Sequence, residues 1–432
     1  MNDLWTLLRS YAGARWRFRR LHGESLAAFQ DRRARAIVAY AIKRSPFYRD
    51  HFAGCDTRDW RALPTVDKQS MMQAFDAFNT ANVHRTDAMD VALRAEADRN
   101  FSATINGLTV GLSSGTSGQR GLFVVDRAEQ LRWAGTMLAR ALPSLRRRGL
   151  RLAFFLRSNS RLYQRLGAWI DFRYFDLTTP LTESIAALNA LHPDVLAAPP
   201  SMLARLGEAR DCGALRIAPE RLVSVAEVLE PQDEERLRAT FGVPVHQVYQ
   251  CTEGLLAVSC AQGSLHLQED VVAVQFEQIS AHDATRMTPI VTDLWRRTQP
   301  IIRYRLGDVL TLAPAPCACG SAFRVIERIE GRLDDVCYQT NPPLFPDDFR
   351  RLILAAHPSI EDYQLTHSPT SIRIHIQTTA PFDEVAAALR SAFAALPLPL
   401  EIRATLDPLP PAEKRRRVKC DRPVPRYLDA RG

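Results

Sequence analysis

Apolar runs alternate with amphipathic stretches over residues 108–260. The apolar runs are short and rich in β-branched and aromatic residues, which favour strands. They are LTVGLSS (108–114), RLAFFL (151–156), VLAAPP (195–200), RLVSVAEVL (221–229) and VHQVYQ (245–250). The stretches DRAEQLRWAGTMLARAL (126–142) and PQDEERLRATF (231–241) have the pattern of helices. Strands that alternate with helices predict an α/β layer architecture.

The segments before and after residues 108–260 have patterns that differ from this alternation. Residues 1–55 have the pattern of helices with basic faces, and strand candidates dominate residues 265–312. After Gly331 the character changes again. Helices are predicted at PDDFRRLILAAH (346–357) and FDEVAAALRSAFAAL (382–396), and strands within EDYQLTHSPTSIRIHIQTT (361–379) and EIRATLDPL (401–409). This β-α-β pattern predicts a separate small C-terminal domain.

We therefore predict an α/β protein with a large multilayer N-terminal domain over residues 1–332 and a smaller α+β domain over residues 333–432. The N-terminal domain is expected to begin with a helical region over about 1–60. A chain of 432 residues is long enough for two or three domains, because a domain typically has ~100–200 residues.

The composition is that of an ordinary globular protein. Hydrophobic residues make up 46% of the chain and charged residues 24%. The longest apolar stretches fall short of the ~20 residues that cross a bilayer. Residues 1–30 lack the continuous apolar region of a signal peptide. We therefore expect a cytoplasmic protein with no membrane partner.

The net charge of +8 comes from basic residues scattered along the chain. Short basic runs occur only at Arg146–Arg148 and Lys414–Arg417. Nucleic-acid binders concentrate basic charge on one face, so we expect no nucleic-acid partner. A solvated arginine-rich surface accounts for the charge, and an anionic nucleotide substrate would benefit from the positive field.

Lysine is scarce among the 56 basic residues. The lysines are Lys43, Lys68, Lys414 and Lys419. This chain uses arginine wherever any cation suffices. A lysine in this chain therefore indicates a position that needs a compact ammonium donor.

A Gly- and Ser-rich loop, GLSSGTSGQRG (111–121), follows a predicted strand and precedes the helix expected near Asp126. Glycines and small hydroxyl residues allow a backbone to approach phosphate oxygens and donate hydrogen bonds to them. The spacing is not that of a Walker A loop. A flexible turn would have the same composition, so the loop alone leaves both interpretations open. The candidate nucleotide-binding residues are Ser113, Ser114, Gly115, Thr116, Ser117 and Gly118.

The loop resembles the Ser-Ser-Gly-[Ser/Thr]-[Ser/Thr]-Gly loop of AMP-forming (adenylate-forming) enzymes, although Gln119-Arg120 replaces their usual Lys-Pro pair. Four further segments resemble motifs of the same enzymes, in the same order. They are VSVAEVLEP (223–231), YQCTEG (249–254), RYRLGDV (303–309) and GRLDD (331–335). Each short motif alone could be a turn, but their order at plausible spacing favours the family.

More segments resemble the phenylacetate–CoA ligase branch of this superfamily, so that the resemblance covers nearly the whole chain. They are SPFYR (45–49), LPTVDK (63–68), APPS (198–201), LFPDDF (344–349) and PAEKRRRV (411–418). The resemblance implies an enzyme that uses ATP to activate a carboxylic acid as its acyl-adenylate. It implies an N-terminal adenylation domain, a mobile C-terminal lid and an aromatic or aryl-alkyl acid as substrate.

The resemblance assigns the catalytic roles to three residues. Thr252 contacts a phosphate, and Glu253 holds Mg²⁺, which neutralises the charges that repel a carboxylate from ATP. Lys414 is the catalytic lysine, whose ammonium reaches the α-phosphate and stabilises the charge of the transition state. A basic surface tail is the alternative for PAEKRRRV, and the scarcity of lysine favours catalysis.

Other residues are implied to bind the nucleotide. Ala226 and Glu227 flank the adenine, and Tyr249 opens the Thr-Glu motif. Asp308 accepts hydrogen bonds from both ribose hydroxyls. The hinge motif places Arg332 near the ribose or phosphate and makes Asp334 the pivot of the lid; Lys68 also matches the branch, with no role firmer than support of the loop.

A second constellation predicts a metal site. Cys260-x5-His266 is followed by Cys317-x-Cys319, and three thiolates with one imidazole are a normal tetrahedral Zn²⁺ set. Buried free cysteines and a core histidine are the alternative, and similar elements in this branch favour metal. Because no ligand position is left for water, we expect structural Zn²⁺, as a clip over about 260–320.

The segment after the hinge motif departs from thioester-forming relatives. Their Arg-Gly-x-Asn is replaced by Thr340–Pro343, and two prolines stiffen the backbone. The acceptor is therefore open between the thiol of CoA, carrier-protein pantetheine, and an amine. The expected partners are a small carboxylic acid, an acyl carrier protein and, in a homodimer, a second copy of the chain.

Two classes of alternative remain. In the first, the same fold transfers AMP to a hydroxyl or activates an oxyanion other than a carboxylate. In the second, the chain is a non-catalytic nucleotide sensor. Intact Glu253, Asp308 and Lys414 argue against a sensor.

Overall fold

The computed structural model describes residues 3–100, 103–113, 120–142, 149–157, 170–280, 283–404 and 416–421. The chain divides into two compact units. The first comprises Met1–Gln275, Ile290–Leu306 and Leu312–Glu327, and the second comprises Phe276–Pro289, Gly307–Thr311 and Arg328–Gly432. The second unit thus contains strand segments that precede the hinge motif, and the predicted domain boundary between residues 332 and 333 stays a prediction.

The first unit contains most of the helices that the structure describes. They are α1 (Asp3–Arg20), α2 (Gly23–Arg44), α3 (Pro46–His51), α4 (Lys68–Gln73), α5 (Phe75–Phe78), α6 (Arg85–Ala97), α7 (Arg127–Ala141), α8 (Leu181–Leu191), α9 (Pro200–Asp211) and α10 (Pro231–Phe241). The helix expected near Asp126 is confirmed. Asp67 caps α4 and Asp126 caps α7, because each carboxylate accepts the backbone N–H three residues later.

The strands of the first unit form a hairpin-like sheet and a larger mixed sheet. They are β1 (Thr104–Ile105), β2 (Leu108–Leu112), β3 (Leu122–Val125), β4 (Leu150–Leu156), β5 (Ile170–Asp176), β6 (Val195–Ala198), β7 (Arg221–Val225), β8 (Val245–Cys251), β9 (Gly254–Ser259), β10 (Leu265–Leu267) and β13 (Tyr304–Arg305). Four strands run from one unit into the other: β11 (Val272–Ser280), β12 (Asp283–Asp293), β14 (Asp308–Leu312) and β15 (Val325–Arg332).

The centre of the larger sheet is parallel, which agrees with the predicted α/β architecture. Strands β5, β4, β6, β7 and β8 lie in this order with parallel pairing, and β9 and β10 continue the sheet antiparallel. Two predicted strands end earlier than expected. The first stops at Ala198 because Pro200 begins α9, and the second stops at Val225 because Ala226 has a φ of +69°.

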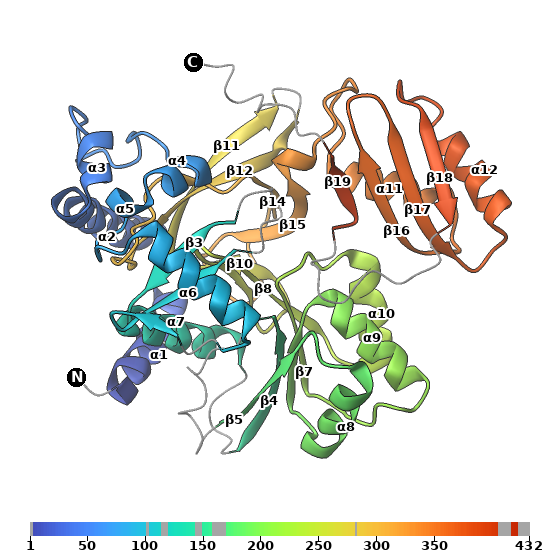
Figure 1. Cartoon of the computed structure of the whole chain (residues 1–432), viewed down its shortest axis with the longest axis horizontal. Helices are drawn as coiled ribbons and strands as arrows, with labels where there is room; N and C mark the ends of the chain where they lie inside the picture. Colours follow the sequence, from blue (N-terminus) through green and yellow to red (C-terminus); the bar gives the residue numbers. More distant parts are fainter. Residues whose placement is uncertain are drawn as a thin grey trace. The chain divides into compact units, whose positions relative to one another are not determined.

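Helices cover both faces of this parallel sheet (Figure 1). In β6, Leu196 and Ala198 belong to a core formed with α8, α9 and α10, whereas Val195 and Ala197 belong to a core formed with α1 and α7. A strand that is buried on both faces is a nearly continuous apolar run, which is the pattern of a parallel sheet between two helical layers.

A glycine allows α1 to approach α7 closely. A Cβ atom at Gly135 would lie 2.6 Å from the carbonyl oxygen of Leu7 and 2.9 Å from the backbone nitrogen of Tyr11. Any larger residue would therefore push α1 away from α7. The predicted basic helices of residues 1–55 are thus confirmed, and the first of them is part of the main core.

The second unit contains a four-stranded sheet with two helices on it. Its elements are the short helix η2 (Leu333–Asp335), α11 (Pro346–Ala356), β16 (Ile360–His367), β17 (Ile372–Thr378), α12 (Phe382–Ala392), β18 (Leu400–Ala404) and β19 (Val418–Cys420). The strand order is β18-β17-β16-β19, with β16 and β17 antiparallel and both outer strands parallel to their neighbours. Side chains of α11 and α12 share one apolar core with the sheet.

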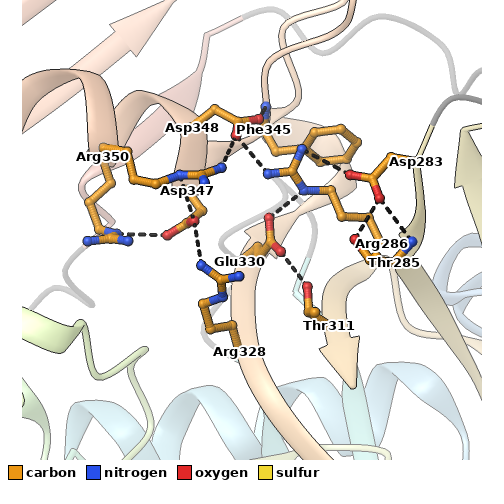
Figure 2. Close-up of polar contacts among 11 residues, drawn as sticks. Asp283, Thr285, Arg286, Thr311, Arg328, Glu330, Phe345, Asp347, Asp348 and Arg350 are labelled. Atoms are coloured by element: carbon orange, nitrogen blue, oxygen red, sulfur yellow. Dashed lines mark hydrogen bonds and ion pairs between the residues drawn. The ribbon is translucent and has the colours of Figure 1, made fainter. Parts of the chain in front are cut away.

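A network of ion pairs fastens the start of α11 to the strands of the same unit (Figure 2). Arg286 of β12 donates to Glu330 of β15 over 2.6 Å and to Asp348 of α11 over 2.7 Å. Arg328 of β15 lies 3.5 Å from Asp347 of α11. The network therefore joins residues on the two sides of the hinge motif.

None of the helices described combines the length and the apolar character needed to span a bilayer.

Candidate active site

Predicted site residues lie at one edge of the parallel sheet. Strands β6, β7 and β8 are adjacent and parallel, so their carboxyl ends meet at the same edge. Ser201 follows the end of β6, Ala226 and Glu227 follow β7, and Thr252 and Glu253 follow β8. This edge is where open α/β sheets bind ligands.

The turn after β7 is held by a direct contact to the neighbouring strand end. The left-handed backbone of Ala226 turns the chain sharply, and Glu227 donates its N–H to the carbonyl of Val225 over 2.9 Å. The Glu227 carboxylate accepts the Ser201 hydroxyl over 3.1 Å and the Ser201 backbone N–H over 3.2 Å. The APPS segment and the Ala-Glu turn are thereby fixed to each other.

The turn after β8 carries Thr252 and Glu253. The Thr252 hydroxyl donates to Oε2 of Glu253 over 2.9 Å. The phenol of Tyr304, which belongs to the RYRLGDV segment, is buried and hydrogen-bonded to Glu253. Burial raises the pKa of Tyr304, and the neighbouring Glu253 carboxylate raises it further, so the phenol stays a neutral donor. Tyr249 lies two residues before the end of β8.

Arg296 is a functional candidate that the sequence reasoning missed. Its side chain is buried and donates to the carbonyl of Thr252 over 2.6 Å and to the carbonyl of Val124 over 3.4 Å. Gln299 accepts from the same guanidinium over 2.8 Å. Because Val124 belongs to the strand that leaves the Gly- and Ser-rich loop, one arginine brings that strand and the Thr-Glu turn together.

The base of the Gly- and Ser-rich loop is closed by two hydrogen bonds. Ser113 donates its N–H to the carbonyl of Gly121, and Gly121 donates its N–H to the Ser113 hydroxyl, both over 2.7 Å. Arg120, which replaces a family residue, forms a bidentate pair with Glu96. A Cβ atom at Gly121 would lie 3.2 Å from Cε of Lys68, so the lysine stem lies against this base.

The predicted residues Ser114, Gly115, Thr116, Ser117 and Gly118 lie outside the described residues, and so does Lys414.

The second unit holds the other two predicted nucleotide-binding residues. Asp308 begins β14, directly after Gly307, whose φ is +74°. Arg332 ends β15, and its Nη1 lies 3.2 Å from Oδ1 of Asp308. The Leu333 N–H donates to the Gly307 carbonyl over 2.8 Å. The RYRLGDV segment and the hinge motif GRLDD are therefore in direct contact.

The predicted metal ligands form one cluster. The ligand atoms of Cys260, His266, Cys317 and Cys319 all lie within 4.8 Å of one another. The Sγ atoms of Cys260 and Cys317 are 3.7 Å apart, and Sγ of Cys319 lies 3.3 Å from Nε2 of His266. A disulfide needs ~2.05 Å, whereas a tetrahedral Zn²⁺ site with ~2.3 Å bonds to sulfur separates its sulfurs by about 3.8 Å. The separations fit the metal.

The surroundings of His266 also fit a metal ligand. The ring is fully buried, and its Nδ1 lies 2.8 Å from the carbonyl of Phe323, which leaves Nε2 toward the sulfurs. Phe18 packs edge-on against the ring at 5.4 Å between centroids. Although burial opposes the thiolate, contacts with Ser264 and the Cys319 backbone lower the pKa of Cys317 to about 6, while burial raises the pKa of Cys319 to about 11.

Comparison with known proteins gives one curated relative and several solved structures of similar fold. No family model matches the chain. The chain is 24% identical over 371 residues to a phenylacetate-coenzyme A ligase of Thermus thermophilus, and the match covers 79% of this chain and 78% of the relative.

Solved structures extend the similarity in fold. A 2-hydroxyisobutyryl-CoA ligase in complex with its acyl-AMP matches with a TM-score of 0.69 at 17% identity, over 94% of this chain and 92% of the other. An anthranilate CoA ligase bound to anthranoyl-AMP matches with 0.52 at 12% identity, over 71% and 66% of the two chains. The amide bond synthetase of Marinactinospora thermotolerans also gives 0.52, at 13% identity over 72% and 68%.

The predicted fold class is thus confirmed: the chain has the fold of the adenylate-forming ligases and is similar in sequence to the phenylacetate–CoA ligase branch.

Proposed function

We propose that this chain is an AMP-forming acid ligase. A carboxylate oxygen attacks the α-phosphorus of ATP, the bond to the β-phosphate breaks, and pyrophosphate leaves. A thiol or amine then attacks the carbonyl carbon of the acyl-adenylate, the nucleophile loses its proton, and AMP leaves. Relatives that carry acyl-AMP and a relative that makes amides support both acceptor classes.

The observation that carries this proposal is the edge of the sheet where β6, β7 and β8 end. Adjacent strand ends place the Ala-Glu turn beside the Thr-Glu turn, and Glu227 joins the Ala-Glu turn to Ser201. Arg296 joins the Thr-Glu turn to β3, the strand that follows the Gly- and Ser-rich loop. A nucleotide with its phosphates needs such a mixture of backbone donors, hydroxyls and a carboxylate at one place.

Glu253 is the carboxylate that would hold Mg²⁺. Its oxygens are hard ligands, and its neighbours Thr252 and Tyr304 orient it by hydrogen bonds. When bound, Mg²⁺ would lower the repulsion between the phosphates and the attacking carboxylate. Thr252 would then turn its hydroxyl to a phosphate oxygen, since it is the side chain next to the metal ligand.

Lys414 is proposed as the catalytic ammonium on a lid formed by residues 333–432, with Asp334 as its pivot. The resemblance of PAEKRRRV to the closing motif of the branch supports this role. Asp308 and Arg332 are proposed to hold the ribose and the phosphate, and the remaining loop residues of GLSSGTSGQRG are proposed to cradle the phosphates.

We propose that Cys260, His266, Cys317 and Cys319 hold one structural Zn²⁺. The cluster joins β9, β10 and the segment before β15, and Phe18 of α1 packs on it. Four protein side chains complete the coordination of the ion. The ion would therefore cross-link these segments and would take no part in the reaction.

The proposed substrate is a small aromatic acid, by analogy with the phenylacetate and anthranilate that two relatives are named for. The proposed acceptor is the thiol of CoA or of a carrier protein, or an amine. The segment that departs from thioester-forming relatives is closed by a pair of hydrogen bonds between the backbones of Cys337 and Leu344. Thr340 donates its hydroxyl to the Cys337 carbonyl over 3.2 Å. This closed loop supports the proposal that the acceptor contacts this segment differently than it contacts the Arg-Gly-x-Asn segment of thioester-forming relatives.

The test is ATP–pyrophosphate exchange with a panel of aryl and alkyl carboxylic acids. We expect exchange with one class of acid, its loss in Lys414→Ala and Glu253→Gln, and normal exchange in Lys43→Ala, a matched lysine on α2. If ATP binds but no acid supports exchange, the carboxylate proposal is wrong. Transfer of labelled AMP to a hydroxyl compound would then indicate the AMP-transfer alternative, and binding without any turnover would indicate a sensor.

A further inference from the structure

The second aspartate of the hinge motif, Asp335, makes contacts that the motif does not predict. It lies next to the pivot candidate Asp334, and its side chain is buried. One carboxylate oxygen, Oδ2, forms an ion pair with the guanidinium of Arg416. The other, Oδ1, accepts the backbone N–H of Cys420 over 3.0 Å. Both partners belong to the last part of the chain that the structure describes.

A third contact fixes the backbone of Asp335. The imidazole of His367 is buried, and burial lowers the pKa of this histidine, so the ring is neutral. Its Nε2 lies 2.9 Å from the carbonyl oxygen of Asp335. Because a carbonyl can only accept, Nε2 carries the proton and donates. The hinge motif is thus held to β16 as well as to the tail.

The tail is held to the sheet of the second unit independently. Strand β19 pairs parallel with β16, and the Leu365 N–H donates to the Arg417 carbonyl over 2.6 Å. The Arg417 guanidinium donates to Asp362 over 2.9 Å. Two neighbouring arginines therefore anchor the tail in two directions, Arg417 to the sheet and Arg416 to the hinge motif.

The burial of Asp335 separates this contact from ordinary surface ion pairs. The side chain of Asp335 is 4% exposed and that of Arg416 is 20% exposed. By contrast, the pair of Arg373 and Glu401 in the same unit is 45% exposed on both sides. A buried carboxylate is costly unless it is paired, and such pairs define one geometry. Asp335 therefore specifies where residues 416–420 lie relative to the hinge motif.

We propose that Asp335 is a positioning residue that fixes the lysine-bearing end of the chain to the hinge motif. Lys414 precedes Arg416 by two residues. A change in the position of Arg416 therefore changes which positions the lysine can reach. The inference rests on the proposed role of Lys414. It adds that the hinge motif carries two separate functions, a pivot at Asp334 and a tether for the tail at Asp335.

The experiment measures pyrophosphate exchange in Asp335→Asn, Arg416→Gln and Arg416→Lys. Asparagine keeps the size of the side chain and the acceptor for the Cys420 N–H, but it removes the charge. We expect Asp335→Asn and Arg416→Gln to lower kcat about 10- to 100-fold, because displacement of a catalytic group by ~1 Å costs about that factor. The KM for ATP should change by less than about threefold, and Arg416→Lys should retain most of the activity.

A double-mutant cycle separates positioning from general damage to the fold. In a Lys414→Ala background, Asp335→Asn should cause no further loss of the residual rate, because there is no lysine left to position. Glu401→Gln, which removes a carboxylate from the exposed pair, should leave exchange unchanged. ATP binding and thermal unfolding of each variant verify that it is folded.

Two results would overturn the inference: a full additional loss from Asp335→Asn in the Lys414→Ala background, or wild-type exchange in folded Asp335→Asn and Arg416→Gln. Wild-type exchange in Lys414→Ala is a different result. It would show that the proposed role of Lys414 is wrong. The positioning role of Asp335 would then be wrong as well, because it depends on that lysine.

Discussion

Arg332 donates a hydrogen bond from Nη1 to Oδ1 of Asp308 over 3.2 Å, so two residues expected to bind one nucleotide bind each other. The Asp308 side chain is 14% exposed and that of Arg332 is 30% exposed. The turn at Gly307 accepts the Leu333 N–H, which joins the backbones as well. Arg332 therefore orients the Asp308 carboxylate, which is the proposed acceptor for the ribose hydroxyls.

Asp308→Asn tests the ribose contact. The amide keeps one acceptor oxygen and loses the charge that strengthens both hydrogen bonds. We expect the Kd for ATP to rise about tenfold, which corresponds to ~1.4 kcal/mol. Titration calorimetry with ATP measures this. Asp421→Asn, at a half-exposed carboxylate of the same unit, is the matched control and should bind ATP normally; equal affinities for all three proteins would refute the ribose contact.

The sequence predicted the α/β layers because each of their strands and helices is a local pattern. The predicted ends of two strands were wrong for local reasons that the structure reveals. Pro199 and Pro200 extend an apolar run although Pro200 begins a helix, and Ala226 adopts a left-handed backbone that alanine rarely favours. The motif residues around Glu227 follow neighbouring strand ends, and their mutual contacts depend on strand order, which the sequence leaves open.

Residues whose contacts lie far apart in the sequence escaped prediction. Arg296 and the exposed Arg297 are neighbours of the same type, and only the first reaches the carbonyls of Val124 and Thr252. The pair of Asp335 and Arg416 spans 81 positions. The cluster of three cysteines and one histidine could be predicted across a gap of 57 residues because cysteine and histidine are rare and chemically specific. Arginine carries no such signal in a chain that uses it everywhere.

Arg286→Met should destabilise the second unit. The side chain of Arg286 is 12% exposed, and its removal leaves Glu330, 3% exposed, without its cation. Breaking one partner of a buried pair costs about 3–5 kcal/mol. Urea unfolding of the full chain, followed by fluorescence and circular dichroism, measures the loss. Arg373→Met, in the exposed pair with Glu401, should cost less than ~1 kcal/mol; similar losses in both variants would contradict the special role of the network in Figure 2.

The metal proposal predicts one zinc per chain by atomic emission. Cys317→Ser should lose that zinc and lower stability, because an ion that binds only the folded chain contributes about 4 kcal/mol when its free concentration is 1,000 times its Kd. Cys212→Ser, at an exposed thiol outside the cluster, is the matched control and should keep both zinc and stability. A purified wild-type chain without zinc that keeps its unfolding temperature in the presence of a strong chelator would show that the four residues are a metal-free core.

His246 should make stability depend on pH in the mildly acidic range. The ring lies on β8 and is 5% exposed. Burial and the nearby charge of Arg221 lower its pKa to about 4, although a hydrogen bond with the backbone of Cys260 acts in the opposite direction. An unfolded histidine has a pKa near ~6.5. Between these two values the unfolded chain binds a proton that the folded chain does not.

The sign follows from that difference in bound protons. The stability that neutral His246 contributes is fully present above about pH 6.5 and is lost as the pH falls toward about 4. Near pH 5 the free energy of unfolding should fall by up to ~1.4 kcal/mol per pH unit from this one group. The free energy of unfolding can be measured by urea unfolding at several pH values from 7.5 to 4.5. Its dependence on pH should be weaker for His246→Asn than for the wild type. His192→Asn removes an exposed histidine and should keep the pH dependence of the wild type. If the pH dependence of the free energy of unfolding is also unchanged in His246→Asn, the His246 ring is protonated in the folded chain.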